Sequence, residues 1–202
     1  DFCLSRGLGD VYKRQAYVFT RLEFKGRNIV FILYLSTMMI PITVRLIPSY
    51  NLCRNLNMLD TYMGMILPQV AWSIPFGTFL MRQFYMGIPK QLDEAAKIDG
   101  ANHFQIFWKI LLPNTKSSMT TLGIYTFISA WNNLIWMLLS VRSEGKWTVT
   151  LGISSICGAS VIKQPTWNLI MGVIVIGMIP VLILFFAFQK YFMQSVAATG
   201  IK

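Results

Sequence analysis

The sequence predicts an all-α protein, a bundle of helices that crosses a membrane several times. Of the 202 residues, 54% are hydrophobic and only 13% are charged, and the mean hydropathy of +0.52 is too high for a soluble domain of this length. Four segments reach about 20 mostly apolar residues, the length with which a helix crosses roughly 30 Å of hydrocarbon. None of them alternates apolar and polar residues as a barrel strand does. The spans are therefore expected to be helices.

The first fifteen residues do not fit this pattern. Residues 1–15 are polar, and their basic Lys13-Arg14 pair directly precedes the apolar stretch that begins at Ala16. They resemble translated sequencing-adapter read-through, so we exclude them from the fold prediction. We expect native sequence to begin near Ala16, at the tail of an earlier transmembrane helix that is missing, and the chain to be a fragment truncated at its N-terminus.

The expected spans alternate with loops that differ in positive charge. The spans cover residues 28–47, 62–81, 118–139 and 169–188. The segments on one side hold ten Lys and Arg residues and those on the other side five, so the first side is predicted to be cytoplasmic. This side includes the long loop 82–117, whereas 48–60 and 142–167 lie outside. The net charge of +10 is interpreted as a topology signal and as contact with anionic lipid headgroups, rather than as nucleic-acid binding.

The long inner loop is predicted to begin with a short helix. Pro89 fits a first helical turn, and two pairs, Lys90 with Glu94 and Asp93 with Lys97, are spaced to support an exposed helix. Gly100 is expected to end this helix because glycine readily takes the left-handed conformation.

A second helix is expected to follow the turn. Asn102 is expected to be its N-cap, and one face would carry Phe104, Phe107, Trp108 and Leu111 until Pro113 breaks the helix. The loop is thus predicted to be a helix, a sharp turn and an amphipathic helix.

Two uses of this loop are compatible with its residues. Leu92, Ala95 and Ala96 would form a small apolar face with a charged rim, which suits insertion into a groove on a cytoplasmic partner. Alternatively, the loop lies on the lipid headgroups, with Phe104, Phe107 and Trp108 as interfacial anchors.

A family resemblance favours docking. The order Glu94-Ala95-Ala96, three residues, Gly100, nine residues, Ile110, one residue, Leu112-Pro113 resembles the EAA loop of ABC importer permeases. From Ala16 onward the chain is similar to the inner-membrane permeases of carbohydrate importers, close to the maltose-type second permease. Further matching stretches are Phe24-Lys25-Gly26-Arg27, Ile66-Leu67-Pro68, Phe127 with Ala130-Trp131-Asn132, and Gln189-Lys190-Tyr191-Phe192. Asn133 and Ser117 depart from the family pattern, which usually has Asp and Pro there, and 155–167 matches weakly.

The resemblance implies a fold and a set of partners. Residues 16–202 would form the transmembrane domain of a type I ABC importer, with four full spans of six. The EAA loop would be the coupling helix, seated in a cleft of the ATP-binding subunit, which gives the candidate coupling residues Glu94, Ala95, Ala96, Asp99, Gly100 and Pro113. The expected partners are a second permease, an ATPase dimer, an extracytoplasmic solute-binding protein and a sugar. ATP would be bound by the partners, since the chain has no Walker A sequence and needs no cofactor. The expected location is the plasma membrane of a bacterium or archaeon, among membrane lipid.

The transport pathway is expected among polar and aromatic residues inside the spans. Such side chains are costly when they face lipid, so they favour the bundle interior. The candidates are Gln69, Trp72, Tyr125, Trp131 and Asn132, of which Trp131 and Asn132 are preferred. The alternative is that each makes only interhelical hydrogen bonds.

Other function classes find less support in the sequence. The expected spans contain no Asp, Glu, His or Cys, and no GxSxG or HExxH motif occurs, so neither catalytic nor metal-binding residues are predicted. The only histidine, His103, is expected to be solvated or packed. A four-span receptor or assembly protein remains an alternative, as does an importer permease for a solute other than a sugar.

Overall fold

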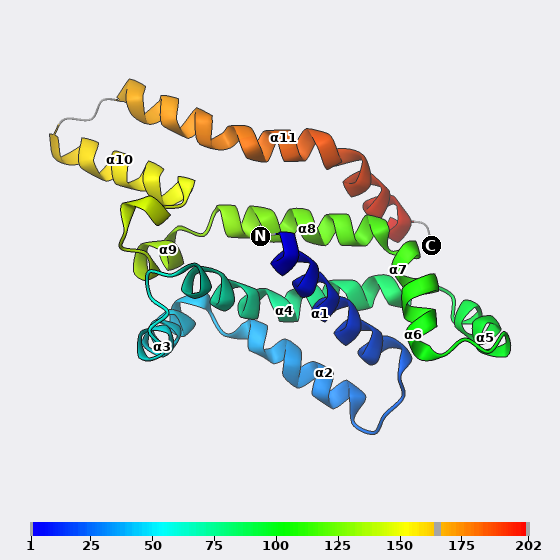
Figure 1. The fold of residues 1–202 in the computed structure, drawn as a ribbon. Coiled ribbons are helices and arrows are strands. Elements are labelled where there is room, and N and C mark those ends of the chain that lie inside the picture. Colours follow the sequence, from blue (N-terminus) through cyan, green and yellow to red (C-terminus); the bar gives the residue numbers. More distant parts are fainter. Residues whose placement is uncertain (1, 164–166, 201–202) are drawn as a thin grey trace. The chain divides into compact units, whose positions relative to one another are not determined.

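The computed structural model describes the backbone of residues 2–163 and 167–200, and the side chains of residues 11–115, 117–158 and 167–189. All regular elements in the described chain are helical (Figure 1). In order, they are α1 (Phe2–Arg21), α2 (Arg27–Ser36), η1 (Thr37–Met39), α3 (Ile42–Asn55), α4 (Tyr62–Met86), α5 (Gln91–Ile98), α6 (His103–Gln105), η2 (Ile106–Leu111), α7 (Leu112–Asn114), α8 (Lys116–Trp131), α9 (Leu134–Ser140), η3 (Glu144–Lys146), α10 (Val149–Lys163) and α11 (Trp167–Gly200).

The chain forms two compact units. The first comprises residues 1–40, 72–123 and 191–202, and the second comprises residues 41–71 and 124–190. In the first unit, buried side chains of α1, α4 and η2 form one apolar cluster, which includes Tyr17, Met81, Tyr85, Ile106, Phe107 and Leu111. Apolar packing therefore joins α1 and α4 to the long loop of this unit.

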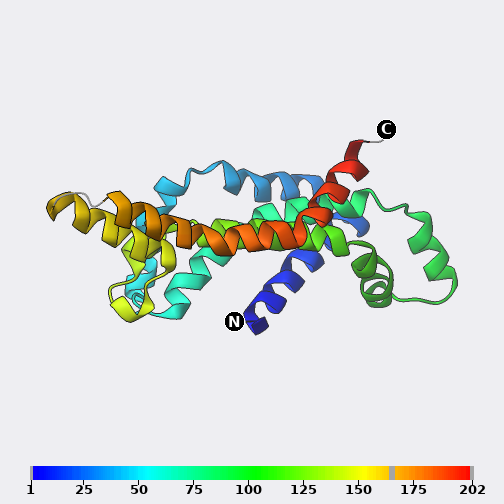
Figure 2. The ribbon, with the colours of Figure 1, turned by 90° about the horizontal axis from the view of Figure 1, so that it is seen from above.

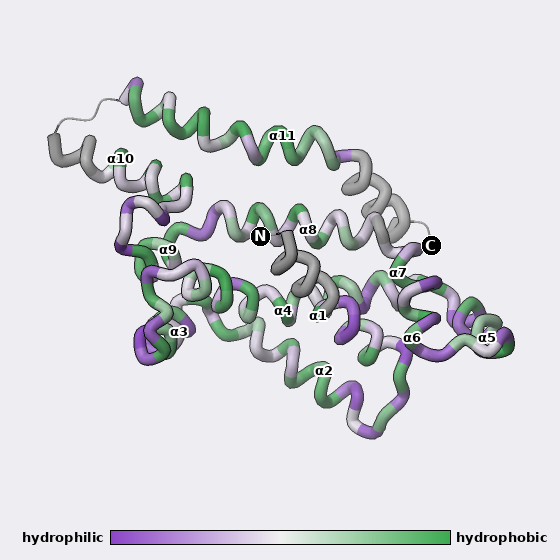
Figure 3. The backbone as a smooth tube through the Cα atoms, in the orientation of Figure 1, coloured by the Kyte–Doolittle hydropathy of each residue, from purple (hydrophilic) through white to green (hydrophobic). Residues whose placement is uncertain are grey.

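Two single helices are long and apolar enough to cross a membrane. They are α4 and the part of α11 from Trp167 to Gln189, and α11 is strongly hydrophobic along most of its described length (Figure 3). The expected spans 62–81 and 169–188 lie inside these helices. Two further stretches are long and apolar enough only if a pair of helices with a bend between them is counted as one span. The number of candidate spans in the described chain is therefore between two and four.

The expected span 28–47 is wrong as a single helix. Ile40 has an extended backbone, with φ −75° and ψ 117°, and α3 begins after Pro41. The ring of a proline disfavours the helical conformation of the residue before it, which accounts for the break. The expected outer connection 48–60 is also largely helical, because α3 continues to Asn55 with Pro48 inside it. Likewise, α10 occupies much of the expected loop 142–167.

The segment excluded from the fold prediction is helical. Helix α1 runs without interruption from residue 2 through Ala16 to Arg21. Tyr12 contacts α4 through a hydrogen bond of 2.9 Å between its hydroxyl and Ser73 Oγ. The hydroxyl of Thr78 donates to Gln15 Oε1 at 2.8 Å. The adapter origin of residues 1–15 stays a prediction.

The long loop 82–117, which is predicted to be cytoplasmic, folds at one end of α4. Both views show α5 and the segment from α6 through η2 beyond the end of α4 where the loop begins (Figures 1 and 2). The expected break at Pro113 is wrong, because α7 continues through this residue to Asn114. Before it, η2 is a π-helix, in which the Leu112 N–H donates to the carbonyl of Phe107, five residues back. The side chains of Asn114 and Thr115 donate to the carbonyls of Ile110 and Leu111 and so cap the helix end.

Candidate functional site

The first half of the candidate site is α5, the helix that carries the Glu-Ala-Ala sequence. The Lys90 carbonyl accepts from the N–H groups of Asp93 and Glu94 at 2.9 and 3.1 Å. Both acidic residues lie in the first turn, and Lys97 lies in the last. This order of charges complements the helix dipole, which is positive at the N-terminus. The short helix is therefore stabilised at both ends by its own sequence.

Gly100 closes α5 as the sequence predicted. Its φ of +80° lies in the left-handed region, which glycine adopts without the steric cost that a Cβ would bring. Its N–H donates to the Lys97 carbonyl at 3.0 Å, and the Ala101 N–H donates to the Ala96 carbonyl at 2.9 Å. These two bonds are those of a Schellman motif. The sharp turn after α5 is thus fixed by main-chain bonds that depend on the left-handed residue.

Asn102 begins the next helix, which confirms the predicted N-cap. Its Oδ1 accepts from the Gln105 N–H at 2.8 Å, and Gln105 Oε1 accepts from the Asn102 N–H at 2.9 Å. This reciprocal capping box satisfies two backbone donors at once. Only one residue, Ala101, separates Gly100 from this cap, so the direction of the chain is set on both sides of the turn.

Arg21 joins the end of α1 to α4 and α5. Its Nη2 donates to the carbonyls of Tyr85 and Ile88 at 3.2 and 2.8 Å, and its Nε lies 2.9 Å from Asp93 Oδ2. Both side chains are buried, with 5% and 10% exposed. The expected pairing of Asp93 with Lys97 is wrong, since Asp93 turns inward to Arg21. A buried guanidinium therefore binds the last turn of α4 to the first turn of α5.

The two faces of α5 differ from the expected arrangement. Ala96 is buried and belongs to the apolar cluster of the first unit, so Leu92, Ala95 and Ala96 do not form one exposed face. Glu94, Ala95, Asp99 and Gly100 are exposed, and Ile98 is 88% exposed. The outward face of α5 therefore combines Glu94, Ala95 and Ile98, while Asp93 and Ala96 hold the helix in place. Pro113 is also exposed, but it lies in α7.

His103 is exposed, and it also contacts α1. Its Nδ1 lies 2.8 Å from the hydroxyl of Tyr17 on α1, and Phe107 meets the Tyr17 ring edge-to-face at 5.6 Å. Among the residues whose side chains are described, no group of three His, Cys, Asp or Glu could hold a metal ion.

A second candidate site lies at the break between α8 and α9, in the second unit. The two helices are bent by 53°, and Asn133 caps α9 by accepting from the Trp136 N–H. A cavity of about 310 Å³ is lined there by Asn132, Asn133 and the apolar residues Ile42, Leu46, Leu134, Ile135 and Trp136. Amides beside an apolar wall can recognise hydroxyl groups and also contact an apolar ligand face.

The candidate pathway residues are not gathered at this cavity. Asn132 lines it, but Gln69, Trp72, Tyr125 and Trp131 do not. Trp131 stacks on Phe127 with 5.5 Å between the ring centroids, and its carbonyl accepts from the Thr150 hydroxyl. Tyr125 is 46% exposed. Of the five candidates, Asn132 is therefore the one that the structure associates with a cavity.

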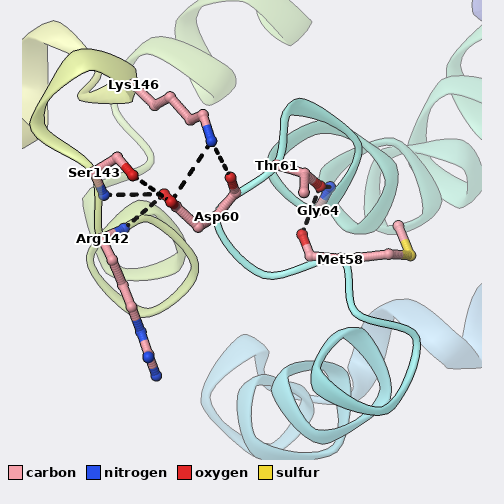
Figure 4. A network of polar contacts seen from close by, with 7 residues as sticks. All are labelled: Met58, Asp60, Thr61, Gly64, Arg142, Ser143 and Lys146. Atoms are coloured by element: carbon pink, nitrogen blue, oxygen red, sulfur yellow. Dashed lines mark hydrogen bonds and ion pairs between the residues drawn. The ribbon is translucent and has the colours of Figure 1, made fainter.

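A polar network fixes the C-terminal end of α9 to the start of α4 (Figure 4). We call the residues Asp60, Arg142, Ser143 and Lys146 the outer clamp, because the distribution of Lys and Arg predicts that this end lies outside. Asp60 Oδ1 accepts from the N–H groups of Arg142 and Ser143, both at 3.0 Å, and Oδ2 accepts from the Ser143 hydroxyl and lies 3.6 Å from Lys146 Nζ. The Ser143 hydroxyl, these two N–H groups and the Lys146 charge hold the pKa of Asp60 well below its ordinary value of 3.8.

Close packing adds to the outer clamp. The indole Nε1 of Trp136, which is fully buried, donates to the Gly64 carbonyl at 3.0 Å. A Cβ added at Gly64 would lie 2.0 Å from the Met58 carbonyl oxygen. The start of α4 and the segment 134–146 are thus held together at two points.

Several of these contacts were not predicted from the sequence. Arg21 was counted only as a topology charge, although it pairs with a residue 72 positions away. Asp60 and Ser143 are separated by 83 positions, and no periodic pattern connects residues so far apart. The exposure of Ile98 carried no signal of its own in the sequence, because single exposed apolar residues are common on protein surfaces.

Comparisons with known proteins agree with the resemblance. The family described as "Binding-protein-dependent transport system inner membrane component" matches residues 16–198. The permease protein UgpE of the sn-glycerol-3-phosphate transport system of Yersinia enterocolitica is 36% identical over 195 residues, which cover 96% of this chain and 68% of the relative. The arabinooligosaccharides permease AraQ of Bacillus subtilis is 34% identical over 180 residues, 89% of this chain and 62% of the relative.

A solved structure shares the fold. It is that of a bacterial ABC transporter involved in the import of the acidic polysaccharide alginate, with a TM-score of 0.69 and 27% identity. The match covers 88% of this chain and 66% of that chain. The chain thus spans about two thirds of the length of these relatives.

Proposed function

Because this chain belongs to the family of binding-protein-dependent transport system inner membrane components, we propose that it forms half of the translocation pathway of an ATP-driven sugar importer. It acts with a second permease, a cytoplasmic ATPase dimer and an extracytoplasmic solute-binding protein, in the plasma membrane of a bacterium or archaeon. The chain performs no chemistry of its own. The observation that carries this proposal is α5, an exposed helix at the family's Glu-Ala-Ala position that is tied to α1 and α4 by a buried arginine.

The geometry of α5 supports a role in coupling. Glu94, Ala95 and Ile98 face outward and present an anionic and apolar surface to an ATPase subunit. Asp93 and Ala96 face inward, where Arg21 connects the helix to the carbonyls at the end of α4. A displacement of α5 by ATP-driven closure is therefore passed to α4 and α1 through buried contacts, which deform less readily than exposed ones.

The substrate is proposed to be a sugar or oligosaccharide. The names of AraQ and of the alginate transporter support a carbohydrate, and Asn132 and Asn133 line a cavity with the amides that bind hydroxyl groups. The name of UgpE keeps a second candidate, a permease for a polar solute other than a sugar, since that relative belongs to a system for sn-glycerol-3-phosphate. A binding assay with the solute-binding protein encoded beside the native gene distinguishes the two classes.

Charge reversal and turn disruption test the coupling role. In the full-length permease with its partner subunits, Glu94→Lys and Gly100→Pro should each abolish uptake of the labelled substrate while the protein stays in the membrane. Glu94→Lys reverses the charge of the outward face, and Gly100→Pro cannot form the turn because proline holds φ near −65°.

The matched control is Glu23→Lys, which reverses the charge of another exposed residue between α1 and α2. It should retain wild-type uptake. Uptake at the wild-type rate by either α5 variant would refute the coupling assignment. ATP hydrolysis by the same preparations, measured with and without the binding protein, separates loss of coupling from loss of assembly. An uncoupled importer still hydrolyses ATP, whereas in an unassembled one hydrolysis does not change when the binding protein is added.

A further inference from the structure

Four cationic side chains converge on one cavity of the first unit. Arg21 ends α1, Arg27 begins α2, Arg82 lies near the end of α4, and Lys90 directly precedes α5. With Phe19, Thr20 and Met86 they line a cavity of about 240 Å³. Like charges repel one another, and more strongly where water is partly excluded. A bound anion would reduce the repulsion among these four cations.

Of the four cations, only Arg21 is paired with a carboxylate among the residues whose side chains are described. Among the residues whose side chains are described, ion pairs join Arg21 to Asp93 and Lys146 to Asp60, and none involves Arg27, Arg82 or Lys90. Arg27 Nη1 donates to the Leu22 carbonyl at 3.3 Å, and the Arg82 guanidinium carbon lies 4.2 Å from the Phe31 ring centroid. Neutral groups thus hold these guanidinium groups in place and leave their charge available to a ligand.

The surroundings of the cavity favour a lipid. It lies at the ends of α2 and α4, which belong to the candidate spans, on the side that the distribution of Lys and Arg predicts to be cytoplasmic. Helix α2, which begins at Arg27, exposes Ile29, Val30, Ile32 and Leu33 by 48 to 66%. A cationic pocket at the headgroup level beside an exposed apolar helix fits an amphiphile with an anionic head and acyl chains.

We propose that this cavity binds the phosphate of an anionic phospholipid headgroup, with Arg27, Arg82 and Lys90 as its ligands and the acyl chains along α2. Arginine guanidinium groups pair with two phosphate oxygens at once, and Lys90 adds a point charge. The bound lipid lies next to Arg21, so it stabilises the junction of α1, α4 and α5.

Lipid binding can be measured directly on the importer. The full-length permease, purified with its partner subunits in detergent, is titrated with phosphatidylglycerol, with phosphatidylcholine or with inorganic phosphate, and bound lipid is counted by native mass spectrometry. The wild type should retain phosphatidylglycerol in preference to phosphatidylcholine. The double variant Arg27→Gln with Lys90→Gln should weaken phosphatidylglycerol binding roughly 25-fold, at about fivefold for each cation removed.

The control is Lys25→Gln, which removes an exposed cation two residues from Arg27 that does not line the cavity. It should bind phosphatidylglycerol as the wild type does. An equal loss in this control, or no loss in the double variant, would overturn the assigned site. Tighter binding of inorganic phosphate than of phosphatidylglycerol at constant ionic strength would identify free phosphate as the ligand instead. Retention of lipid only by permease stripped of its ATPase subunits would assign the cavity to an acidic partner segment.

Discussion

Among the glycines whose surroundings the structure describes, Gly64 has the least space for a side chain. An added Cβ would lie 2.0 Å from the Met58 carbonyl oxygen, and the Gly64 carbonyl itself accepts from Trp136. The Cβ position at Gly123, in α8, has no heavy atom within 4 Å. The two glycines therefore occupy opposite environments, although the sequence does not distinguish them.

We expect Gly64→Ala to lower stability and Gly123→Ala to raise it. The first forces the Met58 carbonyl to move, at a cost of about 1 to 3 kcal/mol. The second restricts only the unfolded chain and should add about 0.4 to 1 kcal/mol. Thermal unfolding of both variants in detergent provides the measurement, and an equal response of the two would contradict the steric argument.

Residue-level prediction succeeded where a residue acts on its own backbone. Gly100 and Asn102 were predicted correctly because a left-handed C-cap and an N-cap depend on neighbours within a few positions. The role of Arg21 was missed because its partner Asp93 is brought close only by the packing of α1 against α4 and α5. Pro113 was misjudged, since the wider π-helix before it and the side chain of Asn114 accommodate the proline.

At the scale of elements, the outer clamp connects segments that the sequence predicts to be independent loops. Asp60 precedes α4, and its partners follow α9. Its positive φ of 56° is uncommon for a residue other than glycine, and the bonds to Arg142, Ser143 and Lys146 stabilise it in that conformation.

We expect acid to loosen the outer clamp. The folded-state pKa of Asp60 lies below its ordinary value of 3.8, chiefly because the Ser143 hydroxyl donates to the carboxylate. A lowered pKa means that the clamp contributes its full stability above about pH 4 and loses it as the pH falls below that value.

Asp60→Asn checks the acid response, because it removes the charge at every pH. The difference in unfolding temperature between wild type and Asp60→Asn should be largest near neutral pH and should shrink in acid. Glu144→Gln removes a neighbouring carboxylate outside the clamp and should keep the acid response of the wild type. A difference in unfolding temperature that stays constant with pH would show that Asp60 stabilises the protein through the geometry of its side chain rather than through its charge.

The spans show how far hydropathy can predict elements. It located α4 and α11 well, because a continuous apolar helix leaves a continuous signal. It joined α2 to α3 into one span, because the window averages across the extended backbone at Ile40 before Pro41. It also treated α10 as a loop, because this apolar helix of 15 residues is shorter than a membrane span.

For the molecule as a whole, the orientation in the membrane is the main property that rests on charge counting. Lys97 on α5 is expected in the cytoplasm, and Gly145 in the outer clamp region is expected outside. Both positions are exposed, and Gly145 has room for a side chain.

A membrane-impermeant thiol reagent tests this orientation. In a full-length permease whose own cysteines are replaced by serine, Gly145→Cys should be labelled in intact cells and Lys97→Cys only after permeabilisation. Labelling in the reverse order would invert the topology, and it would also move the proposed lipid cavity to the opposite leaflet.

The π-helix η2 makes the orientation of the helix that follows depend on the number of residues in the loop. A π-turn accommodates one residue more than the α-turn from which it derives, so 106–111 behaves as an insertion. Deleting one residue there would restore α-helical spacing and rotate everything that follows, Pro113 and α8 included, by about 100° around the helix axis. A permease of this family in which the segment is one residue shorter would therefore turn a different side of its next span toward the same neighbours.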